Sequence, residues 1–179
     1  MKHPVAKIYT TCGTITMELY PECAPNTCCS FIALAKAGCY DHRAIRRIVP
    51  DFVLQPSYNG FDDPQCTYDI AGEFPSAGFA NPLHFRKGTV AMGADETVAS
   101  GSEWYIVLSD DAAEKLDGHF PAFGMVTDGW EEVERLVSVP TRSVAAPEGI
   151  IINEPIAPEI IESVTVETWG IEYPPPKKL

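Results

Sequence analysis

The sequence is poor in basic residues and has no long apolar run, and both shortages narrow the range of functions. It contains 13 Lys and Arg residues against 25 Asp and Glu, which gives a formal net charge of −12 and a pI near 4.6. An acidic surface repels phosphate backbones and anionic lipid, so we expect neither a nucleic-acid partner nor a membrane partner. No apolar run approaches the roughly 20 residues that cross a bilayer.

The start of the chain also lacks the features of a signal peptide. The first ten residues, MKHPVAKIYT, contain neither an apolar core nor a small-residue cleavage site. We therefore expect a cytoplasmic protein. A length of 179 residues suits one domain with a core of its own. Since there is no repeat and no linker, we expect a single domain over 1–170 and a proline-rich tail over 171–179.

The six cysteines do not have the spacing of a metal site. Cys23, Cys28 and Cys29 show no Cys-x-x-Cys pattern and no nearby histidine, so neither zinc nor any other cofactor is expected. An even number of cysteines permits disulfides, but a chain of this length without a signal peptide does not need such cross-links. We interpret the cysteines as reduced structural thiols, with redox sensitivity or metal binding as the alternative.

Hydrophobic periodicity predicts a mainly β protein with two helices. Apolar and polar residues alternate over 5–11 and 14–20, around a Cys-Gly pair, which predicts a hairpin. One helix is expected from Pro25 to Gly38 and another within 127–140, because apolar residues there recur at helical spacing. Further strands are expected on each side of Pro50-Asp51 and within 88–94, 102–109, 116–126 and 158–169. The irregular segment 56–87 is expected to be a functional loop or to hold short pieces of structure of its own.

The order of these elements indicates the fold class. Many strands and two helices, without a regular alternation of the two, argue against a doubly wound parallel sheet. A closed antiparallel β-barrel capped by two α-helices fits the pattern better.

An ordered set of motifs resembles the cyclophilin-type peptidyl-prolyl cis-trans isomerases, in their bacterial-type form. The most specific motifs are RRIVPDFVLQ (46–55) and KLDGHFPAFGMV (115–126), with GTVAMG (88–93) and GSEWYI (101–106) between them. The resemblance extends from Ile8 to Val166. It implies a closed eight-stranded antiparallel barrel with a helix over each end, and an active site on the outer face of the barrel.

The implied reaction is rotation about the peptide bond before proline. This bond has a barrier of about 18–20 kcal/mol, and its two isomers interconvert in roughly 10–100 s. Faster rotation requires no metal, cofactor or covalent step, but it does require a donor for the prolyl nitrogen and an apolar cleft for the ring. The implied partners are proline-containing peptides or unfolded chains, and a monomer is expected.

The resemblance assigns roles to ten residues. Arg47 matches the catalytic arginine, whose fixed charge would lie over the prolyl nitrogen. The expected substrate-binding residues are Phe52, Val53, Gln55, Gly93, Ala94, Glu103, Tyr105, Leu116 and Phe120.

Six of these residues depart from the family's pattern. Glu103 stands where glutamine is usual, and Gly93-Ala94 replace the usual Ala-Asn. Val53 replaces a methionine, Tyr105 a phenylalanine, and Phe120 stands where a histidine is common, although bacterial-type members also have an aromatic there. A carboxylate close to Arg47 would pair with it and occupy donors meant for substrate. The sequence therefore supports a second hypothesis, in which the chain is a non-catalytic cyclophilin-like module that binds proline-containing segments.

Overall fold

The computed structural model describes residues 2–57, 63–145 and 149–179. The strands are β1 (Val5–Thr10), β2 (Thr14–Leu19), β3 (Arg43–Ala44), β4 (Arg47–Val49), β5 (Val53–Gln55), β6 (Asp69–Ala71), β7 (Thr89–Asp95), β8 (Val98–Val107), β9 (Ala122–Asp128), β10 (Thr141–Ala145), β11 (Ile151–Pro155) and β12 (Ile160–Glu167). The helices are α1 (Pro25–Lys36), α2 (Asp110–Leu116) and α3 (Trp130–Ser138), with a 3-10 turn, η1, at Pro75–Ala77. In these described parts of the chain, no helix has the length and apolar character needed to span a bilayer.

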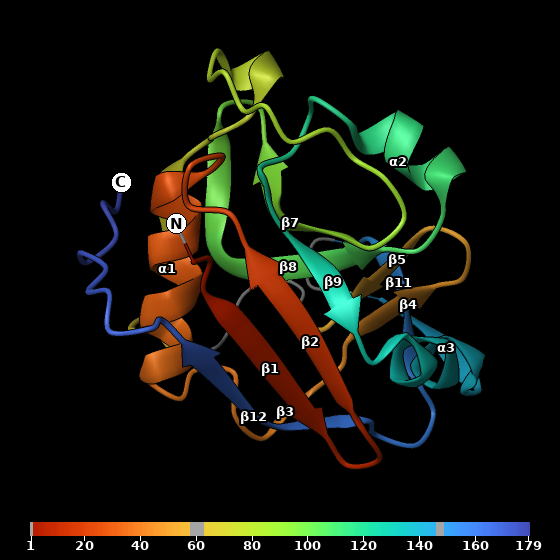
Figure 1. The fold of residues 1–179 in the computed structure, drawn as a ribbon. Helices are drawn as coiled ribbons and strands as arrows, with labels where there is room; N and C mark the ends of the chain where they lie inside the picture. The colour runs from red at the N-terminus through yellow and green to blue at the C-terminus, as the bar shows by residue number, and fades with distance from the viewer. Residues whose placement is uncertain (1, 58–62, 146–148) are drawn as a thin grey trace.

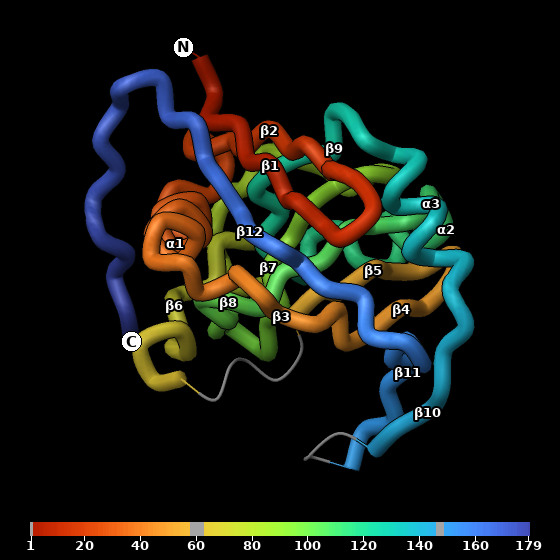
Figure 2. The backbone as a smooth tube through the Cα atoms, turned by 90° about the horizontal axis from the view of Figure 1, so that it is seen from below, coloured from red at the N-terminus to blue at the C-terminus, as the bar shows by residue number. Residues whose placement is uncertain are grey.

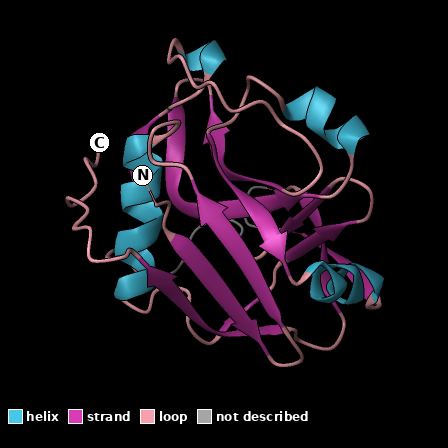
Figure 3. Ribbon diagram, in the orientation of Figure 1, coloured by secondary structure: helices cyan, strands magenta, loops and turns pink. Residues whose placement is uncertain are grey.

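One curled antiparallel sheet dominates the molecule (Figures 1 and 3). Nine of its ten described strands lie side by side in the order β3-β12-β1-β2-β9-β7-β8-β5-β4. The tenth, β6, pairs with β8. The separate hairpin of β10 and β11 completes the β structure of the described chain. In the view of Figure 1, α1 lies on the left of the sheet, and α2 and α3 lie on the right.

Helix α1 packs its apolar face into the core, as its residue spacing predicts. Cys28 and Phe31 are fully buried, and the ring of Phe31 stacks on Tyr40 with centroids 5.2 Å apart. The side chain of Glu73 caps the start of the helix, because its carboxylate accepts hydrogen bonds from the N–H groups of Asn26 and Thr27 at 2.9 and 2.8 Å. A buried carboxylate from a distant loop thus fixes the position of α1.

The second half of β8, from Trp104 to Val107, is buried on both faces, and its side chains alternate between two apolar clusters. Trp104 and Ile106 belong to the main core, which the sheet encloses. Tyr105 and Val107 belong to a second, smaller cluster on the opposite face, which also contains residues of α2. Because successive side chains of a strand point to opposite faces, the same strand contributes to the core and to the outer surface.

The prediction of a closed, eight-stranded barrel is wrong in its details, although the mainly β class is correct. The end strands β3 and β4 do not pair with each other in the described chain. They are two pieces of one bent segment that changes partners: the N–H of Ile45 donates to Glu159 O at 2.8 Å, and that of Arg46 to Pro56 O at 3.2 Å. The chain itself therefore joins the two ends of the sheet, and no ladder of hydrogen bonds closes it.

The prediction of two helices is also wrong, because α2 is a third. The Oγ of Ser109 accepts a hydrogen bond from the N–H of Ala112 at 3.1 Å, which caps the helix. Asp110 and Asp111 in the first turn complement the positive end of the helix. Seven residues form barely two turns, so the apolar periodicity on which the prediction depended is too short to detect.

Two segments in which the sequence shows no strand signal contain short strands. The segment 56–87, expected to be a functional loop or to hold short pieces of structure, includes β6 and η1, while its residues 58–62 lie outside the described chain. The segment between α3 and β12 forms the β10–β11 hairpin, in which Arg142 Nη2 pairs with Glu154 Oε1 at 2.9 Å. Proline, glycine and alanine in that segment hide the alternation that would have predicted strands.

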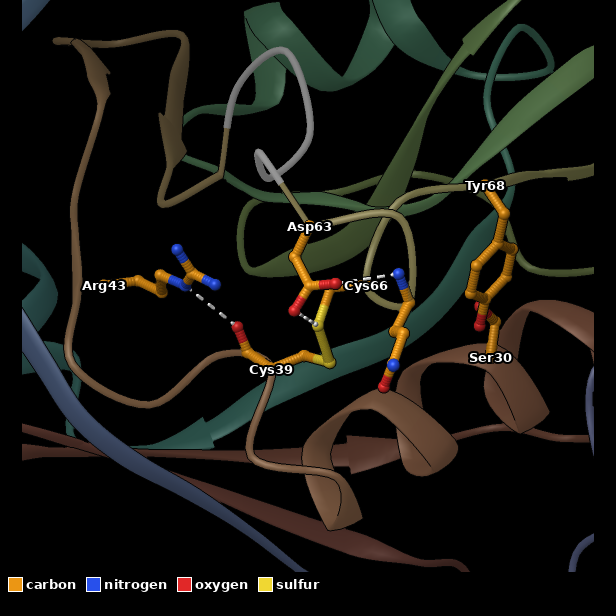
Figure 4. Close-up of a disulfide and its surroundings, with 7 residues drawn as sticks. Ser30, Cys39, Arg43, Asp63, Cys66 and Tyr68 are labelled. Carbon is orange, nitrogen blue, oxygen red and sulfur yellow. Dashed lines mark hydrogen bonds between the residues drawn. A yellow bond between two sulfur atoms is a disulfide. The ribbon is translucent and has the colours of Figure 1, made fainter.

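A disulfide corrects our interpretation of the cysteines as reduced thiols. Cys39 and Cys66 are bonded, with their Cα atoms 5.7 Å apart (Figure 4). Cys39 follows α1, and Cys66 lies in the segment that leads into β6. The other four cysteines are free, and among them only Cys12 is exposed. The sequence contained both residues but no signal that they meet in space.

The tail over 171–179 runs alongside α1 (Figure 2). Lys177 and Asn26 exchange two hydrogen bonds, at 2.8 and 3.0 Å. The N–H of Leu179 donates to Asp69 O at 2.9 Å, so the tail reaches β6. The tail is extended and mostly exposed, as expected, but it is anchored at several points.

The disulfide generates a prediction about stability. Replacing Cys39 and Cys66 by serine should lower the free energy of unfolding by about 3–4 kcal/mol, because the bond closes a loop with a sequence separation of 27. Urea unfolding of the oxidised protein and of the variant measures the difference, and Cys12→Ser is the matched control. The unreduced, denatured protein should expose four thiols. Six titratable thiols would contradict the prediction.

Candidate active site

A groove of about 910 Å³ lies on the outer face of the sheet. Its lining comes from β4 and β5, from the β7–β8 hairpin, from the segment around β6 and from the end of α2. Arg47 and all nine predicted substrate-binding residues line this one groove. Residues from five separate stretches of sequence are thereby brought together.

One half of the groove is apolar. Phe52, Val53, Tyr105, Leu116 and Phe120 line it, and all five belong to the second apolar cluster or pack against it. The rings of Tyr105 and Phe120 meet edge to face, with centroids 5.8 Å apart. Aromatic rings held in this way form a rigid apolar surface, which suits a small ring such as that of proline.

Arg47 is positioned by the β4–β5 hairpin. Arg47 and Gln55 are direct partners in the strand register, and Arg47 Nη1 donates to Gln55 Oε1 at 3.0 Å. The guanidinium carbon lies 6.0 Å from the centroid of the Phe52 ring. Gln55 is buried, whereas Arg47 is partly exposed to the groove. The buried amide orients the guanidinium, so that a fixed positive charge lies at the edge of the apolar half.

The turn between these strands requires an unusual backbone. Asp51 has a φ of 59°, which places it in the left-handed region. The N–H of Phe52 donates to Val49 O at 3.0 Å, and the Oγ of Ser109 donates to Asp51 O at 2.6 Å. Pro50-Asp51 therefore makes a tight turn that returns Phe52 to the same face as Arg47.

The other half of the groove is acidic. Asp69, Asp95, Glu96 and Glu103 line it, and among the described lining residues Arg47 is the one basic side chain. Glu103 lies above Gly93: a Cβ added to this glycine would be 3.7 Å from Glu103 Oε2. Four carboxylates against one guanidinium give this half a negative potential.

Tyr68 forms a wall of the groove and is anchored to α1 (Figure 4). The Oγ of Ser30 donates to Gly101 O at 2.7 Å, so it is the Tyr68 hydroxyl that donates to Ser30 Oγ, at 2.8 Å. The Tyr68 ring lies so close to β8 that a Cβ on Gly101 would be 2.4 Å from it. The ammonium of Lys178 lies 3.9 Å from the centroid of the ring. The Cys39–Cys66 disulfide ties the same segment to the end of α1.

Tyr105 has a buried hydroxyl group. The residue is 4% exposed, and its oxygen has no hydrogen-bond partner within the described chain. Burial raises the pKa of this phenol well above its ordinary value of 10.0, and the charge of Arg47 opposes the shift. A buried polar group without a partner costs about 1–3 kcal/mol.

The sequence analysis did not predict the acidic half of the groove or the position of Tyr68 beside it. Tyr68 and Asp69 lie in the irregular segment, where the sequence offered neither periodicity nor a family motif. Asp95 and Glu96 directly follow Gly93-Ala94, which were predicted to bind substrate. Their closeness in sequence to that pair is the one signal that could have placed them in the groove. Within the described residues, no group of three His, Cys, Asp or Glu side chains is arranged to hold a metal ion.

Comparison with known families gives one clear match. The family model described as cyclophilin type peptidyl-prolyl cis-trans isomerase/CLD matches residues 5–166. The chain is 34% identical to "Peptidyl-prolyl cis-trans isomerase-like 1" of Neurospora crassa over 139 residues, which cover 75% of this chain and 81% of that protein. It is 30% identical to a peptidyl-prolyl cis-trans isomerase of Arabidopsis thaliana over 149 residues, which cover 80% and 87%.

Solved structures show the same fold. A cyclophilin type peptidyl-prolyl cis-trans isomerase of Cryptosporidium parvum superposes with a TM-score of 0.72 at 20% identity, over 93% of this chain and 98% of that one. A second crystal structure of that protein, determined in the presence of the dipeptide Ala-Pro, also has a TM-score of 0.72. It is 22% identical and covers 92% of this chain and 99% of that one.

Proposed function

The chain belongs to the cyclophilin-type peptidyl-prolyl cis-trans isomerase family, and we propose that it isomerises X-Pro bonds in the groove on the outer face of its sheet, with Arg47 as the catalytic residue. Its substrates are proline-containing peptides and unfolded protein chains. One observation carries the proposal: a guanidinium held by a buried amide adjoins an apolar half-groove lined by aromatic rings.

In this proposal the apolar half holds the proline ring. Phe52 and Phe120 border the space, with Tyr105 and Leu116 beneath it, so the ring is removed from water on binding. Burial of the ring fixes one side of the X-Pro bond while the other side turns. The acidic half of the groove, with its four carboxylates, contacts the residues next to the proline and accommodates polar and charged side chains there.

Arg47 stabilises the twisted bond. As the bond leaves planarity, the lone pair of the prolyl nitrogen localises and becomes an acceptor. A guanidinium donor placed over that nitrogen interacts more strongly with the twisted state than with the planar state, and only such a difference accelerates the reaction. Gln55 accepts from Arg47 Nη1 and so keeps the guanidinium in place without neutralising it.

We also propose that the protein acts as a monomer, in the cytoplasm, with residues 1–170 as the domain and 171–179 as the tail. The last strand ends at Glu167, which supports this division. Disulfides persist in oxidising compartments. A cytoplasmic location therefore requires that Cys39 and Cys66, which are bonded in the structure, are held reduced in the cell and form the bond on oxidation.

A non-catalytic binding module is the second candidate function. The observation that favours it is the acidic half of the groove, where Glu103 replaces a neutral side chain in the motif. A module of this kind would bind proline-containing peptides without accelerating their isomerisation.

The role of Arg47 can be tested with a matched neighbour. Arg47→Ala should lower kcat/KM for an Ala-Pro peptide by about a hundredfold, because it removes the donor to the prolyl nitrogen. Arg46→Ala should retain the parental rate, since Arg46 is half exposed and pairs with Glu154 at 3.5 Å. NMR exchange spectroscopy measures both rates. Equal rates for the parent and Arg47→Ala would disprove the assignment.

The Glu103→Gln variant distinguishes between the two candidate functions, an isomerase and a non-catalytic binding module. If the carboxylate draws the guanidinium of Arg47 away from substrate, removing its charge should raise kcat/KM severalfold. Glu96→Gln is the matched control, because it removes the charge of another carboxylate that lines the groove and should leave the rate of a neutral peptide near that of the parent. A lower rate for Glu103→Gln would refute the sequestration argument, and peptide binding without any acceleration by the parent would favour the module.

The acidic half of the groove predicts that peptides with a positive charge next to the proline are preferred as substrates. A peptide with lysine before the proline should have a kcat/KM about threefold or more above that of its glutamate counterpart, because four carboxylates line the groove that we propose holds the peptide. The ratio should fall toward one in 1 M salt, where the Debye length is about 3 Å. Equal turnover of both peptides at low salt would exclude an electrostatic role for these residues.

A further inference from the structure

The hydroxyl of Tyr105 is a buried hydrogen-bonding group that the protein does not use. Ser57, Ser102 and Trp104 also have a buried polar atom without a partner in the described chain, but none of these three lines the groove. Tyr105 is 4% exposed and does line it. The hydroxyl oxygen itself is buried, so a molecule bound in the groove supplies the missing partner once the rings around it, such as Phe120, move aside.

The surroundings of Tyr105 give the hydroxyl no structural role. The cluster around it consists of apolar side chains, among them Val53, Val107 and Leu116, and its ring packs edge to face against Phe120. A phenylalanine would fill the same space and avoid the cost of burying a hydroxyl. The hydroxyl is useful only if its partner arrives with the ligand.

The hydroxyl is also suited to donate. A phenol is neutral at physiological pH, and burial raises the pKa of Tyr105 further, so it retains its proton. Arg47 and Tyr105 line the same groove. The groove that we propose for the prolyl bond therefore contains a neutral O–H donor as well as a guanidinium.

We propose that Tyr105 donates a hydrogen bond from its hydroxyl to a backbone carbonyl oxygen of the bound peptide. Carbonyl oxygens flank the proline ring in every X-Pro substrate, and they are acceptors only. This contact fixes one side of the bond before rotation, which makes Tyr105 a substrate-binding residue through its hydroxyl as well as its ring. The inference rests on the proposed function of the groove.

Two tyrosine-to-phenylalanine variants test the proposal as a matched pair. Tyr105→Phe should weaken binding of an Ala-Pro peptide, measured by NMR titration, by about 2- to 10-fold, the range for one neutral hydrogen bond. KM should rise by a similar factor while kcat stays within about twofold, because the contact is made before and during rotation. The Tm should stay level or rise. Tyr68→Phe should lower the Tm, because its hydroxyl has a protein partner in Ser30.

Each outcome decides the question. Unchanged peptide affinity and unchanged KM in Tyr105→Phe overturn the proposal, and so does a loss of Tm comparable to that of Tyr68→Phe, which would show a structural hydroxyl. If the parent protein binds the peptide but does not isomerise it, the proposed function fails. The titration still tests the hydroxyl in that case, because binding does not require catalysis.

Discussion

The alternation of side chains along the second half of β8, from Glu103 to Val107, is the constraint on which both the fold and the groove depend. Trp104 and Ile106 point into the main core, while Glu103, Tyr105 and Val107 point to the other face. A slip of one residue in the register would exchange the two sets and place the carboxylate in the core. The pairing of β8 with β5, β6 and β7 prevents such a slip. The packing of the core therefore also determines the position of the groove residues.

The two halves of the groove are held by different means. The apolar half belongs to the sheet and is stabilised by the cluster under α2. The acidic half includes the segment before β6. This segment is linked to α1 by the Tyr68–Ser30 hydrogen bond and to the end of α1 by the disulfide, and its Tyr68 ring packs against β8 at Gly101. The sheet and α2 thus hold the apolar half, whereas links between distant segments hold part of the acidic half.

The sequence predicted the parts of the fold that have a local signal. The β1–β2 hairpin, α1, α3 and the strands around Pro50-Asp51 all have a period or a turn residue, and each lies close to where it was predicted. Helix α2 is too short to show a period. The change of partners at Ile45 and Arg46 depends on two distant strands, so no local pattern reports it. All ten candidate site residues came from the resemblance, and they line one groove. The Cys39–Cys66 pair and the wall at Tyr68 could not be predicted, because they exist only once distant segments meet.

The position of β1 has a consequence for synthesis on the ribosome. This strand pairs with β2 on one side and with β12 on the other, and Val5 lies opposite Glu167. While the chain is being translated, β1 keeps one edge open until the last strand has left the exit tunnel. An open edge of this kind is a template for pairing with other chains. The nascent protein is thus most exposed to misassembly just before its own sheet is complete.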